Sequence, residues 1–138
     1  ASEVVPEDYA RLARLAAEEG NFEEALRLTR EARRASPSSA RLAVDEAYFL
    51  SQSGDDDAAA RLLEETLEKE PDAEGMLMLA RILVRRPERL ADAGAWAARA
   101  LRTNAAALLE IERDPDLRAV AALPDVHAAM SKARRMLG

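Results

Sequence analysis

The sequence predicts an all-α protein made of antiparallel helix pairs, and three observations lead to this prediction. A frame of turn-forming residues recurs after 34 residues, because Gly54 follows Gly20 and Pro71 follows Pro37 at that interval. The segments between these residues are rich in Ala, Leu, Arg and Glu, which lose little conformational freedom in a helix. Their apolar residues recur every three to four positions, the period of a helix with one buried face. A fixed interval of this length indicates a helical repeat.

The first predicted pair consists of helices near 6–19 and 22–35. Between them, Gly20 can adopt the left-handed conformation that ends a helix. Asn21 then caps the second helix, and Glu24, three residues further on, has the position of a capping-box partner. This segment therefore predicts one complete helix hairpin.

The second predicted pair repeats this order with helices near 40–53 and 56–70. Asp55 follows Gly54 as the helix cap, and Pro71 prevents the second helix from continuing. Small residues at equivalent positions of the three repeats let the paired helices approach closely; they are Ala25, Ala59 and Ala93.

The third predicted pair has helices near 73–85 and 89–102, but its turn is different. Pro87 and Glu88 replace the glycine and the acidic residue, which predicts another bend geometry. The tail predicts three further helices, near 105–113, 116–123 and 124–137. The resulting organisation is a single domain over 1–138, with repeats near 6–39, 40–73 and 74–107 and capping helices over 105–138.

The composition excludes several classes of protein. Hydrophobic residues make up 49% and charged residues 33%, as in a globular chain, and the net charge of −6 disfavours nucleic acid as a partner. The chain has no cysteine and hence no disulfide or thiolate metal site. We expect no membrane insertion, because no apolar run reaches about 18 residues. The absence of cysteine fits the cytoplasm. The opening "ASEVV" lacks a signal-peptide pattern, and the periplasm stays open if a signal peptide was removed.

No set of residues predicts catalysis, a cofactor or a metal site. The single histidine, His127, lies on the last predicted helix, where packing or surface exposure explains it best. The run Asp55 to Asp57 lacks the glycine and the bidentate glutamate of a calcium loop, so helix capping accounts for it. Because phosphate-loop, dinucleotide and nucleophile-elbow patterns are also missing, we expect no enzyme.

These features resemble the tetratricopeptide repeat family, in its bacterial type with a C-terminal segment that closes the array. The first repeat carries the family pattern most fully, with Tyr9, Leu12, Ala13, Gly20, Phe22, Ala25, Ala32 and Pro37. The second repeat keeps Ala47, Gly54, Ala59 and Pro71, and the third keeps Leu77, Leu90, Ala93 and Ala100. The segment "IERDPDLRAVAALPDVHAAM" is similar to the closing segment. The resemblance implies a right-handed superhelix with a concave groove that binds peptides or proteins.

In this family, one face of the first helix of each repeat lines the groove. Carried over to this sequence, the resemblance implies contacts with an acidic or mixed peptide from Arg14, Arg41, Tyr48, Gln52, Met78, Ile82 and Arg85. The alternative is that some of these are ordinary surface residues. The carboxylate clamp that some members use for chaperone C-termini is absent, because its positions hold Ala10, Arg14, Asp45, Gly75 and Leu79. A co-chaperone role for heat-shock proteins is therefore not supported.

The function predicted from these features is a non-catalytic scaffold or adaptor that binds another protein or peptide. One alternative is a structural repeat protein that self-assembles end to end, and a homo-oligomer is a related option; the cap-like tail argues against long fibres. Another is a module of a larger signalling or secretion and assembly protein. Trp96 is expected to pack between helices, whereas an exposed Trp96 would suggest self-association.

Overall fold

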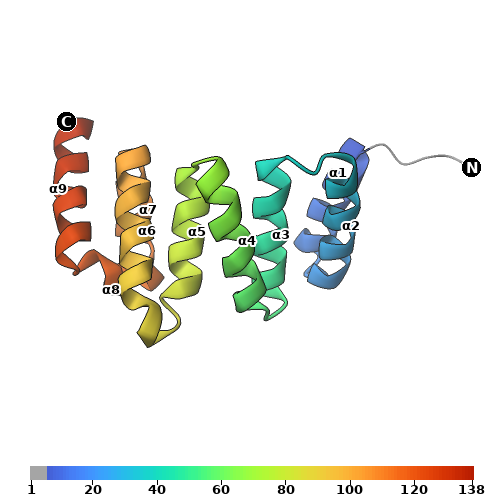
Figure 1. Ribbon diagram of the computed structural model, residues 1–138, viewed down its shortest axis with the longest axis horizontal. Helices are drawn as coiled ribbons and strands as arrows, with labels where there is room; N and C mark the ends of the chain where they lie inside the picture. The colour runs from blue at the N-terminus through green and yellow to red at the C-terminus, as the bar shows by residue number, and fades with distance from the viewer. Residues whose placement is uncertain (1–5) are drawn as a thin grey trace, which may run out of the picture. The chain divides into compact units, whose positions relative to one another are not determined.

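The computed structural model describes residues 6–138, and every regular element in that range is helical (Figure 1). This confirms the predicted all-α class. The opening "ASEVV", on which the signal-peptide expectation depended, lies outside the described residues. The elements are α1 (Pro6–Glu18), α2 (Phe22–Ala35), α3 (Ala40–Gln52), α4 (Asp56–Lys69), α5 (Ala73–Leu83), the 3-10 helix η1 (Pro87–Arg89), α6 (Leu90–Thr103), α7 (Ala107–Arg113), the 3-10 helix η2 (Pro115–Leu117), α8 (Arg118–Ala121) and α9 (Pro124–Leu137).

The chain divides into two compact units, 1–66 and 67–138, and each is described by itself. The first unit contains α1, α2, α3 and most of α4, and the second contains the end of α4 and all later elements. Helices α1 and α2 pack together as a pair in the first unit, and α5 and α6 do so in the second. The first and third predicted helix pairs are thus present, and most helix ends lie within two residues of the expected positions.

The tight turns after α1 and α3 depend on glycine in the left-handed conformation. Gly20 has φ 79° and Gly54 has φ 95°. In each turn, the residue after the glycine donates its amide hydrogen to the carbonyl five residues earlier, at 2.8 Å and 2.9 Å. These bonds satisfy carbonyl groups that the end of a helix leaves without partners. The two glycines therefore set where each hairpin reverses, as predicted.

Side chains cap the helices that follow these turns. Asn21 accepts a hydrogen bond from the amide of Glu24 at 3.2 Å, and Asp55 accepts one from the amide of Ala58 at 3.2 Å. Both predicted caps are confirmed. The predicted capping box is only half formed, because the carboxylate of Glu24 hydrogen-bonds Arg27 one turn further along the helix.

The turn between α5 and α6 has the different geometry that the sequence predicts. Instead of a glycine turn, η1 leads directly into α6. Helix α5 ends at Leu83, two residues before the expected end at Arg85. The proline accounts for the difference, because the residue before Pro87 is driven to an extended conformation, and Arg86 has φ −112° and ψ 116°.

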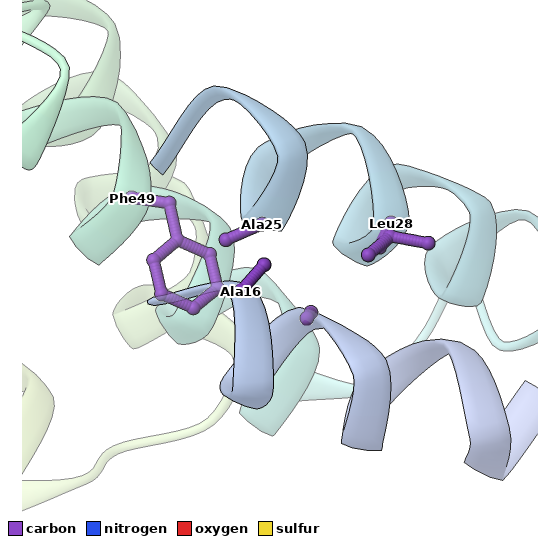
Figure 2. Packing of buried hydrophobic residues seen from close by; sticks show 5 residues of the cluster. Ala16, Ala25, Leu28 and Phe49 are labelled. Carbon is purple, nitrogen blue, oxygen red and sulfur yellow. The ribbon is translucent and has the colours of Figure 1, made fainter. Parts of the chain in front are cut away.

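The core of the first unit is built on alanines at the helix contacts. Ala25 and Ala59 are fully buried, and so is the equivalent Ala93 in the second unit. Phe49 of α3 reaches between α1 and α2 and lies against Ala16 and Ala25 (Figure 2). The small side chains bring the helix backbones close enough for one aromatic ring to fill the remaining space.

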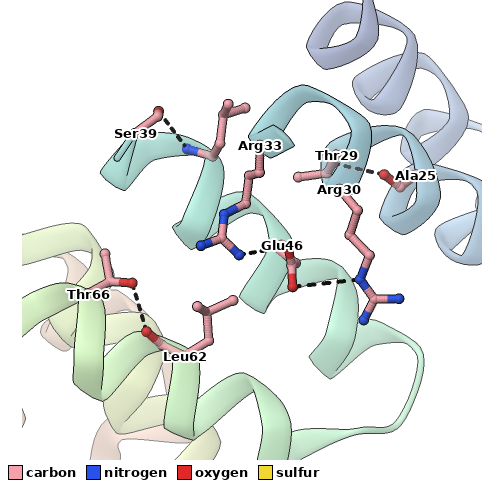
Figure 3. Close-up of polar contacts among 9 residues, drawn as sticks. Ala25, Thr29, Arg30, Arg33, Ser39, Glu46, Leu62 and Thr66 are labelled. Atoms are coloured by element: carbon pink, nitrogen blue, oxygen red, sulfur yellow. Dashed lines mark hydrogen bonds and ion pairs between the residues drawn. The ribbon is translucent and has the colours of Figure 1, made fainter. Parts of the chain in front are cut away.

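A buried carboxylate links α2 to α3. Glu46 is almost fully buried, and one of its oxygens accepts a hydrogen bond from Nη1 of Arg33 at 2.9 Å (Figure 3). Nε of Arg30 lies 3.7 Å from the other oxygen. A buried carboxylate is costly unless it is paired, so this contact holds the first hairpin and the next helix in one register.

In the second unit, the tail packs onto the α5–α6 pair and contributes to one core. Almost fully buried side chains of this core include Met76, Leu79, Ile111, Leu117, Val120 and Val126. Trp96 on α6 is half-buried, and the guanidinium of Arg99 lies 4.9 Å from its ring centroid. Arg99 also donates a hydrogen bond to Glu68 at 2.9 Å. Trp96 is therefore neither fully packed between helices nor fully exposed.

Asp114 joins the tail to α5. Its carboxylate accepts hydrogen bonds from Nε of Arg81 and, at 2.9 Å, from the backbone amide of Asp116. Burial by itself would raise the pKa of Asp114, but these hydrogen bonds and the charge of Arg81 outweigh it and hold the pKa below its ordinary value. The ionised carboxylate therefore stabilises the folded second unit.

We predict that Gly54→Ala lowers the free energy of unfolding by about 1–2 kcal/mol, because an L side chain is strained at this positive φ. Gly54→Asn is the matched control, since asparagine tolerates the left-handed conformation better, and we expect a smaller loss. Urea unfolding followed by circular dichroism measures both. Equal stability of the alanine variant and the wild type would contradict the role given to this turn.

We also predict that Asp114→Asn lowers the free energy of unfolding by about 1–2 kcal/mol at pH 7, because Arg81 loses a charged partner. The folded pKa is lowered, so the wild-type advantage is present above the ordinary pKa of about 4 and is lost as the pH falls through the folded value. Urea unfolding of both proteins from pH 7 to about pH 2 measures the difference. A difference independent of pH would contradict this ionic contribution.

Candidate functional site

Four polar side chains form a row along α3 in the first unit. Arg41, Asp45, Tyr48 and Gln52 are separated by four, three and four residues, which places them on one side of a helix. Arg14 of α1 is close enough to Asp45 for its charge to act on that carboxyl group. These five residues are called the α1–α3 face, and four of them are predicted site residues.

Tyr48 is an exposed aromatic residue supported by the core. It is 39% exposed, and its ring meets the ring of Phe22 edge-on at 6.4 Å and that of Phe49 at 5.6 Å, measured between centroids. Phe49 is itself buried between α1 and α2 (Figure 2). Edge-to-face contacts of this kind favour a defined ring orientation. Tyr48 therefore presents an amphipathic surface whose position is set before any partner arrives.

The carboxyl group of Asp45 is subject to the positive charges of two arginines. Nε of Arg41 is 3.5 Å from Oδ1 of Asp45, and the side chain of Arg41 is 74% exposed. Burial raises the pKa of the Asp45 carboxyl, and the charges of Arg41 and Arg14 oppose this effect without cancelling it. The two arginines thus offset only part of the cost of burying the Asp45 carboxylate. Most of the Arg41 side chain remains accessible to solvent.

The other three predicted site residues belong to the second unit. Met78 is half-buried on α5, and Ile82, one turn later, is only 4% exposed. Arg85 is exposed and lies in the turn after α5. The structure brings the four predicted site residues of the first unit together on the α1–α3 face. The three predicted site residues of the second unit lie on α5 and in the turn after it.

Asp45 is the member of this face that the sequence did not predict as a contact residue. Its spacing of four residues from Arg41 is the signal that could have identified it, because oppositely charged residues at this spacing meet on a helix. The position of Arg14 beside it was not predictable in this way, since α1 and α3 are distant in the sequence.

The described part of the chain offers few other groups that could take part in catalysis or metal binding. His127 is exposed on α9. Within residues 6–138, no group of three or more histidine and acidic residues is arranged to hold a metal ion. None of the helices in this range is both long enough and apolar enough to cross a membrane.

Comparison with known proteins gives a match to a sequence family model over part of the chain and a likeness in fold to solved structures. A sequence model described as tetratricopeptide repeat matches residues 16–82. No curated protein matches the chain. Among solved structures, the type III secretion translocator chaperone SycD of Yersinia enterocolitica is similar, with a TM-score of 0.66 and 15% identity over 96% of this chain and 87% of that chain.

Two further structures of the same chaperone have a similar fold. An alternative dimer of SycD gives a TM-score of 0.65 and 16% identity, covering 99% of this chain and 96% of that chain. SycD in complex with a peptide of the translocator YopD gives a TM-score of 0.69 and 14% identity, covering 99% and 98%. At these identities, the likeness concerns the fold alone.

We predict that Asp45→Asn raises the free energy of unfolding at pH 7, because burial disfavours the ionised carboxylate. The folded pKa is raised, so the wild type has its full stability below the ordinary pKa of about 4 and loses part of it as the pH rises through the folded value. The two proteins should therefore converge in acid. Urea unfolding at several pH values measures this, with Glu65→Gln as a control for loss of an exposed charge. A less stable variant at pH 7 would mean that attraction to the arginines outweighs burial.

Proposed function

We propose that the protein is a non-catalytic adaptor that binds a peptide segment of another protein, on the premise that residues 16–82, which match the tetratricopeptide repeat model, belong to that family. The proposal treats the three repeats and the capping helices as one binding domain. It assigns the contact to the α1–α3 face. The observation that carries it is an exposed tyrosine, held in place by aromatic rings, on the same helix face as the exposed Arg41.

Tyr48 has the properties of a binding anchor. Tyrosine and arginine are over-represented among the residues that dominate binding energy, because each combines a large contact area with directed hydrogen bonding. The Tyr48 ring is already oriented by Phe22 and Phe49, so binding would cost little side-chain entropy. Within the part of the chain that the structure describes, its hydroxyl group makes no hydrogen bond, which leaves it available to a ligand.

The charges around Asp45 favour a peptide with at least one carboxylate. The Arg41 guanidinium is mostly exposed and loosely paired at 3.5 Å, so it can donate two parallel hydrogen bonds to a ligand carboxylate. Arg14 adds a second positive charge beside the same site. Asp45 would repel an acidic group placed directly over it, so the ligand carboxylate is expected on the Arg41 side. An acidic or mixed peptide fits this arrangement best.

The fold comparison supports a peptide as the ligand class. SycD, whose fold this chain shares, has been solved in complex with a peptide of YopD. In the second unit we propose Met78 and Arg85 as additional contacts, because methionine adapts to varied apolar shapes and Arg85 is exposed. We also propose Ile82 as a contact residue. Because Ile82 is only 4% exposed, neighbouring side chains must move before a ligand can reach it.

The double variant Arg41→Glu/Tyr48→Ala tests the proposed face. We expect it to weaken binding about thirtyfold or more, because it reverses one anchoring charge and removes the aromatic anchor. Affinity capture from the native lysate, followed by mass spectrometry, identifies partners of the wild type. Titration of the first recovered partner against both proteins then gives the change in affinity.

Arg61→Glu/Leu109→Ala is the matched control, because it also reverses one exposed charge and truncates one exposed apolar side chain. Both variants are checked for wild-type helicity and thermal stability before the comparison. An unchanged set of partners, bound with unchanged affinity by Arg41→Glu/Tyr48→Ala, would remove the α1–α3 face from the function.

A further inference from the structure

Large apolar side chains that remain exposed are concentrated on α1 and at the end of α9. Within the described residues, those at least 39% exposed are Leu12, Leu15, Tyr48, Leu109, Met136 and Leu137. Tyr48 belongs to the α1–α3 face, and Leu109 lies on α7. The remaining four form two separate surfaces, one in each unit, and neither takes part in the function proposed above. Exposed apolar surface of this kind commonly marks an interaction site.

The surface on α1 combines two leucines with carboxylates. Leu12 is 39% and Leu15 is 48% exposed, and their spacing of three residues puts them side by side on the helix. Glu18 and Glu19 follow Leu15 by three and four residues, so both flank it. Both glutamates are exposed, and neither forms an ion pair with any residue that the structure describes. The leucines and glutamates are called the α1 stripe.

The surface in the second unit is a hollow between α6 and α9. Gly94 lets α6 approach the start of α9 closely, because a Cβ atom at Gly94 would lie only 2.5 Å from Cδ1 of Leu123, the N-cap of α9. Near their C-terminal ends the two helices leave a hollow of about 180 Å³, which is called the α6–α9 hollow. Its lining consists of Leu101, Arg102, Ala129, Lys132, Ala133 and Met136.

The charge of the α6–α9 hollow is opposite to that of the α1 stripe. Its apolar floor is flanked by Arg102 and Lys132, which are exposed and form no ion pair within residues 6–138. Met136 at its edge is 69% exposed and has the flexible side chain that adjusts to an inserted group. The hollow therefore fits a helix that presents aliphatic side chains beside carboxylates.

We propose that the α6–α9 hollow binds the α1 stripe of a second copy of this chain. Leu12 and Leu15 of one copy would pack on the apolar floor and against Met136 of the other. Glu18 and Glu19 would face Arg102 and Lys132. The occupant is identified by this double match, because the same chain carries an apolar–acidic helix edge and an apolar–basic hollow, both exposed and both without charged partners.

One such contact leaves a free hollow on one copy and a free stripe on the other. These two can meet in a two-fold symmetric dimer, or further copies can add head to tail. The tail was expected to act as a cap against such growth. In the structure, however, the end of α9 presents Met136 and Leu137 to solvent rather than a fully polar surface, and that exposed end is the physical basis for the proposed association.

Charge reversal in two variants of the full chain tests the contact. Sedimentation equilibrium over a concentration series should show the wild-type mass rising above the 15.1 kDa of one chain. Arg102→Glu/Lys132→Glu and Glu18→Lys/Glu19→Lys should each weaken association about tenfold or more, because each replaces attraction by repulsion. An equimolar mixture of the two variants should associate again, since the intact stripe of one meets the intact hollow of the other.

Recovery in the mixture separates the proposal from unfolding, because misfolded variants would not restore each other. Arg61→Glu/Arg118→Glu, with the same change in net charge, should associate like the wild type, and so should Arg41→Glu/Tyr48→Ala. A wild type that stays at 15.1 kDa at every concentration would overturn the proposal. So would an association that either reversal leaves unchanged, or a mixture that fails to recover.

Discussion

The structure depends on the mutual burial of helix faces that are too short to be stable alone. The longer helices have between 11 and 14 residues, and isolated helices of that length are marginal in water. Each one therefore needs the apolar stripe of a neighbour. Alanines without exposed surface, such as Ala25 and Ala93, bring paired backbones close, and larger side chains such as Phe49 and Leu79 fill the space between successive helices. Stability comes from this chain of neighbours rather than from any single helix.

Polar contacts decide which neighbours meet. Glu46 is paired with arginines of the preceding helix, and Asp114 is paired with Arg81 of a helix some thirty residues earlier. Apolar stripes alone tolerate sliding, whereas a buried carboxylate is costly in every register that leaves it unpaired. These ion pairs therefore add specificity to a core built mainly from alanine and leucine.

The packing of each helix against its neighbours also determines which side chains remain accessible. Tyr48 is exposed, yet its ring rests on aromatic residues of the core, so a rigid anchor follows from the packing beneath it. The exposed leucines of α1 and the exposed Met136 of α9 have a different origin. They lie on α1 and at the end of α9, where the described helices leave these side chains uncovered. In a fold stabilised by neighbouring helices, an uncovered apolar face is a surface on which another helix can pack.

The sequence alone determined the helix class, the helix caps and the turn geometry at Gly20, Gly54 and Pro87, because these features depend on residues a few positions apart. The 34-residue interval is a property of the sequence itself. The sequence also placed α2 and α9 at their observed limits. Tertiary structure decided the rest. The burial of Ile82, the approach of Arg14 to Asp45 and the hollow between α6 and α9 depend on the distance between segments far apart in the chain. Such distances are set by side-chain packing between helices. The periodicity of the sequence indicates which face of a helix is buried, but it does not give the distance to the neighbouring helix.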